Sequence, residues 1–334
     1  MIYKDRIYGE IKIEKPVILE LIESKPIQRL KYIDQAGYPP LYYNPRNLPI
    51  SELKHTRFEH SLGVYCLLKK FGAPLVEQIA GLIHDVSHTV FSHCIDYVLD
   101  SGSEKEQNHQ DNIFDSFVKN SEITGIFEKY DIDLQHILNK NNFPLLEKSL
   151  PDLCADRLDY SLRTAIIFRE INYQDLNYFL DNLIIEKESW LFKNFENAKK
   201  YAELFLKLNT FYYAGLASAV MLRTVGDILK YALQKGYISE DDLYTSDEEI
   251  LSKIKLNLEK DERLKLLFDR MNNKVKFKNN PANYDVKIFC KSRIVDPSFE
   301  ENGEIRRVSD ADKNWKNILE VEIKPKEYFL KFEK

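Results

Sequence analysis

The spacing of apolar residues changes from a period of two to a helical period near the start of the chain. Ile7, Ile11 and Ile13 alternate with charged neighbours, which predicts a short β-hairpin or paired strand over residues 1–15. From residue 17 to about residue 35 the apolar positions follow one face of a helix. A loop rich in proline and asparagine is predicted over residues 39–49.

Two strongly apolar helices are predicted after this loop. The first covers HTRFEHSLGVYCLLKKFG and is closed by Gly72. The second starts at Pro74 and runs through PLVEQIAGLIHDVSHTVFSHCIDYVL. Helical spacing predicts further helices at 109–119, 146–167, 175–185, 195–210 and 215–235, and two exposed helices in the charged stretch 240–276.

The pattern changes again beyond Pro281. The segments VKIFCKSRIV and EYFLKF predict strands, with a turn at Glu301–Gly303 between them. We therefore predict a mainly α fold with a small β-rich N- and C-terminal appendage. Residues 1–235 are expected to form the main domain with its N-terminal hairpin, and residues 236–334 an appendage of charged helices and strands. Pairing of the C-terminal strands with the N-terminal hairpin is one arrangement that this pattern allows.

Composition narrows the class of protein. The chain has 334 residues, of which 44% are hydrophobic and 30% charged, and its formal net charge is -5. This balance, without a basic stripe carrying interleaved aromatics, argues against a nucleic-acid partner. The four cysteines lack CxxC spacing, which predicts reduced thiols in the core of a cytoplasmic protein. No apolar leader and no run of about 18 apolar residues occurs, so no membrane association is expected.

Six of the seven histidines lie between residues 55 and 109. Adjacent His84 and Asp85 stand in a strongly apolar stretch, where a charge is costly unless a partner or a metal compensates it. In the predicted helix, His84 and His88 share one face. Imidazole and carboxylate donors together suit a divalent Mn, Fe, Ni, Zn or Mg ion. A single histidine here would be an ordinary core residue, but the cluster favours a metal site.

Three motifs in this order, HTRFEHSLGV, GLIHDVSHTVFSH and DLCADRLDYSLR, resemble those of the HD superfamily of phosphohydrolases. Within it, the sequence resembles the deoxynucleoside triphosphate triphosphohydrolases, a branch that includes bacterial dGTPases. The match covers about residues 1–170, whereas 200–235 and RIVDPSF…EIRRVSD match more loosely. The resemblance implies an HD-domain helical bundle with metal ligands at His60, His84, Asp85 and Asp156. Four such donors leave positions on the ion for water and a phosphate oxygen.

The resemblance also implies residues that bind the substrate. Arg57 falls on the position that binds the phosphate beside the metal, and Arg157 stands where the family has a phosphate-binding lysine. Gln35 falls on a position that contacts the sugar, and Tyr160 on a tyrosine that lines the nucleotide site.

The family's acid/base group falls on His88, His93, Asp96 and His109. In that pattern Asp96 orients one histidine while another protonates the leaving oxygen, a task that suits an imidazolium near pH 7.

The sequence departs from the family where the sugar and outer phosphates bind. Thr164 replaces an aspartate that bonds the sugar 3'-hydroxyl, and Met221 falls near a tyrosine that gates the sugar. The segment FYYAGLASAVMLRTVG lacks the arginine-rich stretch that grips the outer phosphates. Lys4 stands where allosterically regulated relatives have asparagine, which argues against regulation by nucleotides.

Three functions remain open at this point. The favoured one is metal-dependent hydrolysis of a nucleotide phosphoester, namely dNTP to deoxynucleoside plus triphosphate. The alternative is another HD phosphohydrolase, which is a nucleoside monophosphatase, a pyrophosphatase or a phosphodiesterase, and the missing outer arginines favour it. A non-catalytic nucleotide-binding module is the third, and the intact His/Asp set argues against it. The resemblance further implies a small-molecule nucleotide substrate and a homo-oligomer.

Overall fold

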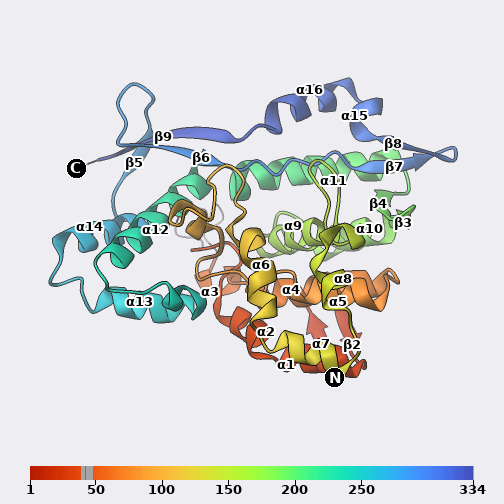
Figure 1. The fold of residues 1–334 in the computed structure, drawn as a ribbon. Coiled ribbons are helices and arrows are strands. Elements are labelled where there is room, and N and C mark those ends of the chain that lie inside the picture. Colours follow the sequence, from red (N-terminus) through yellow and green to blue (C-terminus); the bar gives the residue numbers. More distant parts are fainter. Residues whose placement is uncertain (39–41, 43–47, 334) are drawn as a thin grey trace.

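A computed structural model describes residues 1–38, 42 and 48–333, and most of the predicted proline-rich loop at 39–49 lies outside the described residues. The described chain is mainly helical, with one small sheet at the N-terminus and two small sheets in the C-terminal half (Figure 1). The predicted fold class is therefore confirmed.

The N-terminal strands pair as predicted. Strands β1 (Ile2–Asp5) and β2 (Gly9–Lys12) form an antiparallel hairpin with Asp5 opposite Gly9. One carboxylate oxygen of Asp5 accepts hydrogen bonds from the backbone N–H groups of Ile7 and Tyr8 and closes the turn. The other oxygen lies 3.0 Å from Nη2 of Arg163, which attaches the hairpin to the helical core.

The centre of the helical part consists of α4 (Arg57–Lys70), α5 (Leu75–Ile83) and α9 (Ala155–Ile167). Helix α4 packs against both of the others. It begins with a capping box, in which Thr56 accepts from the backbone N–H of Glu59 and Glu59 accepts from that of Thr56. This cap fixes the start of α4, and with it the direction of Arg57 and His60.

The prediction of one helix from Pro74 to residue 99 is wrong. Helix α5 ends at Ile83, and the chain regains helical form only in the 3₁₀ helix η2 (Ser92–Tyr97). Groups distant in sequence bond the backbone between them: Arg29 donates to the carbonyls of Val86 and His88, and Asp247 accepts from the N–H of Phe91. These tertiary bonds replace helical ones, so His84 and His88 are not neighbours on one helix face.

Two small sheets lie in the C-terminal half. In one, β3 (Leu183–Glu186), β4 (Ser189–Phe192), β7 (Ser298–Glu301) and β8 (Glu304–Arg307) lie in the order β3-β4-β7-β8. In the other, β9 (Lys326–Phe332) lies between β5 (Phe277–Asn279) and β6 (Val286–Cys290).

The predicted strand EYFLKF is therefore present as β9, whereas VKIFCKSRIV is a strand only over Val286–Cys290, as β6. The predicted turn at Glu301–Gly303 is present between β7 and β8. Asn302 and Gly303 both adopt positive φ between β7 and β8, as a tight turn requires. Within the described residues β7 pairs with β4 and β6 pairs with β9, and none of these strands pairs with the N-terminal hairpin.

The other helices agree with the predicted positions in part. The predicted helix at 109–119 is present as α6, whereas the one at 175–185 ends at Asn182 because β3 begins there. Their bounds are α1 (Pro16–Glu23), α2 (Lys25–Arg29), η1 (Leu30–Tyr32), α3 (Ile50–Leu53), α6 (His109–Lys119), α7 (Ile123–Lys129), α8 (Leu134–Leu138), η3 (Lys140–Asn142), α10 (Tyr173–Asn182), α11 (Phe195–Leu208), η4 (Asn209–Tyr213), α12 (Leu216–Gln234), η5 (Asp241–Tyr244), α13 (Asp247–Lys255), α14 (Glu262–Met271), α15 (Val308–Ala311) and α16 (Lys313–Glu322).

One cluster of buried apolar side chains extends from Ile7 to Phe332. The four cysteines are free and buried, as predicted, and three of them, Cys66, Cys94 and Cys290, belong to this cluster. The division at residue 235 stays a prediction. Among the described helices, none combines the length and the apolar character needed to cross a membrane.

Candidate metal centre and active site

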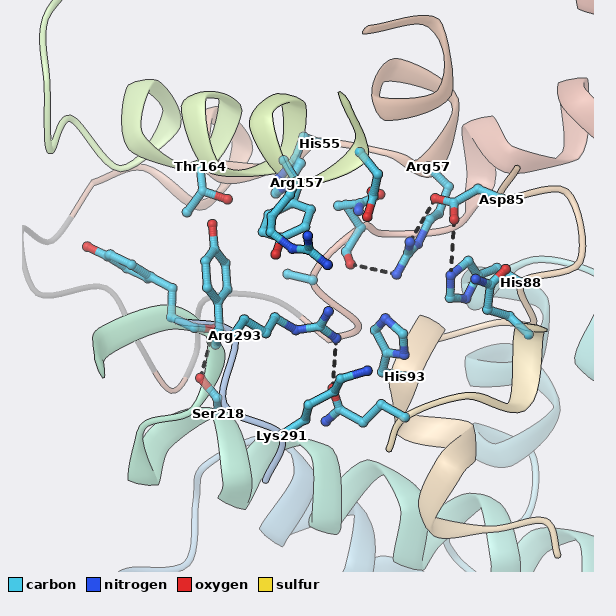
Figure 2. Close-up of a pocket in the computed structure, with 18 of the residues that line it drawn as sticks. His55, Arg57, Asp85, His88, His93, Arg157, Thr164, Ser218, Lys291 and Arg293 are labelled. Atoms are coloured by element: carbon cyan, nitrogen blue, oxygen red, sulfur yellow. Dashed lines mark hydrogen bonds and ion pairs between the residues drawn. The ribbon is translucent and has the colours of Figure 1, made fainter. Parts of the chain in front are cut away.

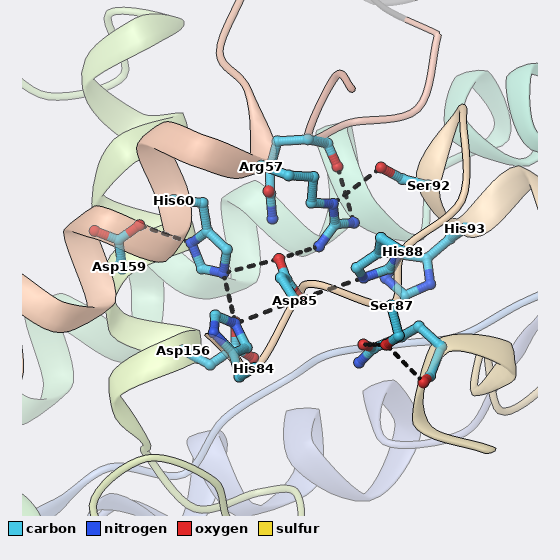
Figure 3. A network of polar contacts seen from close by, with 12 residues as sticks. Arg57, His60, His84, Asp85, Ser87, His88, Ser92, His93, Asp156 and Asp159 are labelled. Carbon is cyan, nitrogen blue, oxygen red and sulfur yellow. Dashed lines mark hydrogen bonds and ion pairs between the residues drawn. The ribbon is translucent and has the colours of Figure 1, made fainter. Parts of the chain in front are cut away.

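Four predicted ligands converge from three elements (Figure 3). His60 lies on α4, His84 and Asp85 follow the last residue of α5, and Asp156 lies in the first turn of α9. The Nε2 atom of His60 lies 2.9 Å from an oxygen of Asp156, 3.2 Å from Nε2 of His84 and 3.7 Å from an oxygen of Asp85. The end of α5 allows adjacent His84 and Asp85 to point to the same place.

The spacing of these atoms fits one divalent metal ion. Ligand atoms of His60, His84 and Asp156 all lie within 4.8 Å of one another, and Nε2 of His84 lies 3.4 Å from an oxygen of Asp85. Two ligand atoms that bond the same ion at about 2.0–2.2 Å, with a right angle between the bonds, lie about 3 Å from each other. Two imidazoles and two carboxylates form the mixed N/O donor set that suits transition metals.

The electrostatics of this cluster favour positive charge at its centre. Burial opposes protonation of His60, but hydrogen bonds to Asp156 and Asp159 outweigh it and raise the pKa of His60 to about 9. Burial likewise opposes ionisation of Asp85, but Arg57 and His84 hold its pKa well below the usual value. The raised pKa of His60 shows that carboxylates surround it, and the lowered pKa of Asp85 shows that Asp85 is ionised. A bound cation would neutralise this negative charge.

Asp159 and Arg163 support His60, and sequence analysis did not single them out. The Nδ1 atom of His60 lies 2.7 Å from Asp159, which Arg163 holds through bonds of 3.0 and 2.9 Å. Gly63 of α4 makes this close approach possible, because a Cβ there would lie 2.1 Å from Asp159. The i, i+3 spacing from Asp156 to Asp159 in DRLDYSLR was the available signal.

Glu147 and Cys154 form a second group with Asp156, with ligand atoms within 4.8 Å of one another. Burial raises the pKa of the Cys154 thiol to about 12, so it carries a proton at neutral pH. A protonated thiol is a poor metal ligand, so this group is the weaker candidate.

The ligand cluster opens into a cavity of about 250 Å³ (Figure 2). Gln35, Tyr160, Thr164 and Met221, which the resemblance places near the nucleoside, all line it. The Oε1 atom of Gln35 and the hydroxyl of Tyr160 are buried without a hydrogen-bond partner in the described structure. Unpaired buried polar atoms are costly, so both are suited to bond a substrate.

The two predicted phosphate-binding arginines are held differently. Arg57 donates to Asp85 at 2.7 Å and to Ser92 at 2.9 Å, which directs it to the ligand cluster. Arg157 also lines the cavity, but its guanidinium bonds the carbonyls of Lys148 and Asp152. Arg157 therefore holds the loop before α9 as well as contributing charge.

The predicted acid/base group is brought together only in part. His88 and His93 line the cavity, with ring centroids 5.0 Å apart. Asp96 lies behind them, where it contacts Nδ1 of His93 at 3.3 Å and accepts from the backbone N–H of His109 at 2.9 Å. The His109 ring bonds Ser101 and does not line the cavity.

The environment of His88 and His93 favours their neutral forms. Burial and the charge of Arg57 lower the pKa of His88 to about 3. Burial, followed by the charges of Arg293, Arg57 and Lys291, holds the pKa of His93 well below its usual value. An imidazole among cations is unprotonated near neutral pH. It carries a proton that it can donate only when a nearby anion offsets their charge.

Lys291 and Arg293, which sequence analysis also missed, enter the cavity from the segment after β6. The Nζ atom of Lys291 donates to the carbonyl of Glu106, and Arg293 donates to Gln107 at 2.8 Å. The two basic residues alternate in CKSRIV, and this spacing on a predicted strand was the signal.

Comparison with known proteins finds a family match over the segment that carries the four candidate ligands. The family model described as HD domain matches residues 57–164. An uncharacterized Bacillus subtilis protein, YdhJ, is 34% identical over 296 residues, which are 88% of this chain and 87% of that protein. The metal-dependent phosphohydrolase cns2 of Cordyceps militaris is 37% identical over 55% of this chain and 50% of its own length.

Two further matches are more distant. The deoxynucleoside triphosphate triphosphohydrolase SAMHD1 of Mus musculus is 30% identical over 39% of this chain and 22% of its own length. A phosphohydrolase structure from Bacteroides thetaiotaomicron has a TM-score of 0.71, covers 100% of both chains and is 18% identical, which supports the fold alone.

Proposed function

Because the chain belongs to the HD family of metal-dependent phosphohydrolases, we propose that it hydrolyses a nucleotide phosphoester, with dNTP to deoxynucleoside plus triphosphate as the reaction. The observation that carries this proposal is the opening of the cluster of His60, His84, Asp85 and Asp156 into a cavity with cations and unpaired polar groups. The name of the mouse relative adds support for the dNTP.

The proposed metal ligands are His60, His84, Asp85 and Asp156, and a bound divalent ion would polarise a phosphate oxygen and a water molecule. Arg57, held by Asp85 and Ser92, presents charge beside this position and stabilises negative charge that develops on the phosphate. Because these bonds fix the orientation of the Arg57 guanidinium, it need not move as negative charge develops on the phosphate.

His93 is the proposed proton donor to the leaving oxygen. It lies in the cavity wall, and Asp96 contacts its Nδ1 atom and orients the ring. Phosphate charge beside Arg293 and Lys291 offsets two of the three cations that, together with burial, hold the pKa of His93 low. Substrate binding therefore favours the protonated form that this step needs.

The nucleoside is proposed to lie against Gln35 and Tyr160. Each presents a buried polar atom without a partner in the described structure, and Thr164 is available as a neutral hydroxyl. A hydroxyl bonds the sugar less strongly than a carboxylate would. A broad preference among deoxynucleotides is therefore expected.

A shorter phosphate substrate is the second candidate, and one observation favours it. Helix α12 presents Ser218, Met221 and Leu222 to the cavity, all of them neutral. Among the residues that the structure describes, α12 thus places no cation in the cavity wall for the outer phosphates of a triphosphate. A nucleoside monophosphatase, pyrophosphatase or phosphodiesterase would use the same metal ligands.

Product analysis tests the proposal. The protein is incubated with dNTPs, NTPs and dNMPs in Mn or Mg, and products are separated by HPLC. Inorganic triphosphate supports the proposed reaction, whereas orthophosphate or pyrophosphate supports the second candidate. Bound metal with no turnover on any substrate would show a binding module instead.

A further inference from the structure

Lys291 and Arg293 differ from the other cations that line the cavity. Three of those have carboxylate partners: Arg57 with Asp85, Lys140 with Asp111 and Arg157 with Glu147. In the part of the chain that the structure describes, no carboxylate oxygen lies within 4.0 Å of Lys291 or Arg293, which bond a backbone carbonyl and an amide oxygen. Two adjacent cations without a counter-charge in a half-buried place are costly.

The backbone that carries these two residues is fixed by a buried side chain. The Oδ1 atom of Asn209 accepts from the N–H of Arg293 at 2.8 Å, and its Nδ2 atom donates to Ser292 at 3.0 Å. Ser292 is buried, whereas Lys291 and Arg293 on either side of it both line the cavity. Asn209 thereby holds the register in which both cations face the same space.

The two cations lie close to the proposed reaction centre. The Arg293 side chain extends across the cavity between Arg157 and Lys291, with His93 beside it (Figure 2). Its guanidinium carbon lies 5.9 Å from the centroid of the Tyr160 ring. Burial and the charge of Arg293 lower the pKa of Lys291 to about 8, so an anion bound here would stabilise its charged form.

We propose that Lys291 and Arg293 bind the phosphate groups of the substrate that lie beyond the phosphorus under attack, so the substrate class is a nucleoside polyphosphate. The proposal rests on the proposed function and deepens it. Lys291 and Arg293 of the C-terminal segment would thus take the role of the arginines that the resemblance implies and that α12 lacks. A monophosphate would leave both of them without a counter-ion.

Binding of inorganic triphosphate tests this without turnover. Titration calorimetry on the full chain in EDTA compares the wild type with Lys291→Gln/Arg293→Gln. Loss of two charge-assisted contacts should weaken triphosphate binding by about 100-fold. The control, Lys287→Gln/Arg306→Gln, removes the same charge at exposed residues paired with Glu327 and Glu301 and should stay within about twofold.

The exchanged variant Lys291→Arg/Arg293→Lys keeps both charges and should recover most of the affinity, which a purely structural role would not predict. A melting temperature for each variant checks folding. Equal triphosphate affinity in the wild type and Lys291→Gln/Arg293→Gln would overturn the proposal, and so would a wild type that does not bind triphosphate.

Kinetics separate this proposal from the proposed function. With a dNTP, Lys291→Gln/Arg293→Gln should lose at least about tenfold more in kcat/KM than with a dNMP, and the additional loss should appear mostly in KM. Equal losses on both substrates would overturn the polyphosphate assignment. A wild type that binds triphosphate through these residues but hydrolyses no nucleotide would overturn the proposed function and leave the binding site standing.

Discussion

The Nδ1 atom of His60 lies 2.7 Å from Oδ2 of Asp159, and both side chains are fully buried. A carboxylate only accepts at neutral pH, so Nδ1 donates a proton to Asp159, and Nε2, which faces Asp156 and His84, is the atom that would bind a metal ion. Arg163 fixes the other side of Asp159. Asp159 is thus expected to set the tautomer and orientation of a metal ligand.

Asp159→Asn should weaken metal binding by about 10- to 100-fold, as is typical when the partner of a metal-ligating histidine is changed. The amide no longer neutralises the Nδ1 proton and loses one oxygen that bonds Arg163. Affinity is measured by competition with a chromophoric chelator. Asp115→Asn, at an exposed residue, is the control. Unchanged affinity in Asp159→Asn would show that Asp159 has no part in orienting His60.

Asp85→Ala should remove both bound metal and activity. The change deletes an anionic ligand and also leaves the buried Arg57 without its carboxylate partner. Metal content per chain and dNTP turnover are measured on protein whose circular dichroism matches that of the wild type. Full metal occupancy in this variant would mean that Asp85 is not a ligand.

His93→Ala and His109→Ala should keep the metal but lose rate to different extents. His93 lines the cavity, so its loss should lower kcat by about 10²- to 10⁴-fold, the usual value of a positioned proton donor. His109 reaches this site only through Asp96, so a smaller loss is expected. Metal content and kcat are compared for both. A larger loss in His109→Ala would reverse these roles, and loss of metal in either variant would make that residue a ligand.

Sequence analysis located much of the site because its residues lie in short motifs. HTRFEH and ADRLDY place His60 and Asp156 on helices that the apolar spacing predicts. The end of α5 at Ile83 was not predicted, because the bonds that replace helical ones come from Arg29 and Asp247, far away in sequence. The spacing of apolar residues within a segment does not show which distant residues bond its backbone.

The cations of the cavity illustrate the same limit. Lys291 and Arg293 were read only as part of a strand, since nothing near them in sequence shows that Asn209 directs them inward. Arg157 was correctly expected at the cavity, but its bonds to Lys148 and Asp152 depend on how the preceding loop folds back. These arrangements depend on chain segments that meet only in the folded state, so the local sequence does not predict them.

Burial raises the pKa of Asp34 to about 8 and that of Asp247 to about 7, and the carboxylate of Asp247 further raises the pKa of Asp34. Both values exceed the usual value of about 3.9 for an unfolded chain. The folded state therefore binds more protons than the unfolded state, so stability falls as pH rises from about 4 to about 8.

Asp34→Asn keeps an oxygen to accept from the N–H of Ala36 but cannot ionise. Its free energy of unfolding should fall less than that of the wild type between about pH 5 and about pH 8. Urea unfolding at several pH values measures the difference, with Asp115→Asn as the control. Parallel curves for the wild type and Asp34→Asn would show that Asp34 ionises at its ordinary pKa.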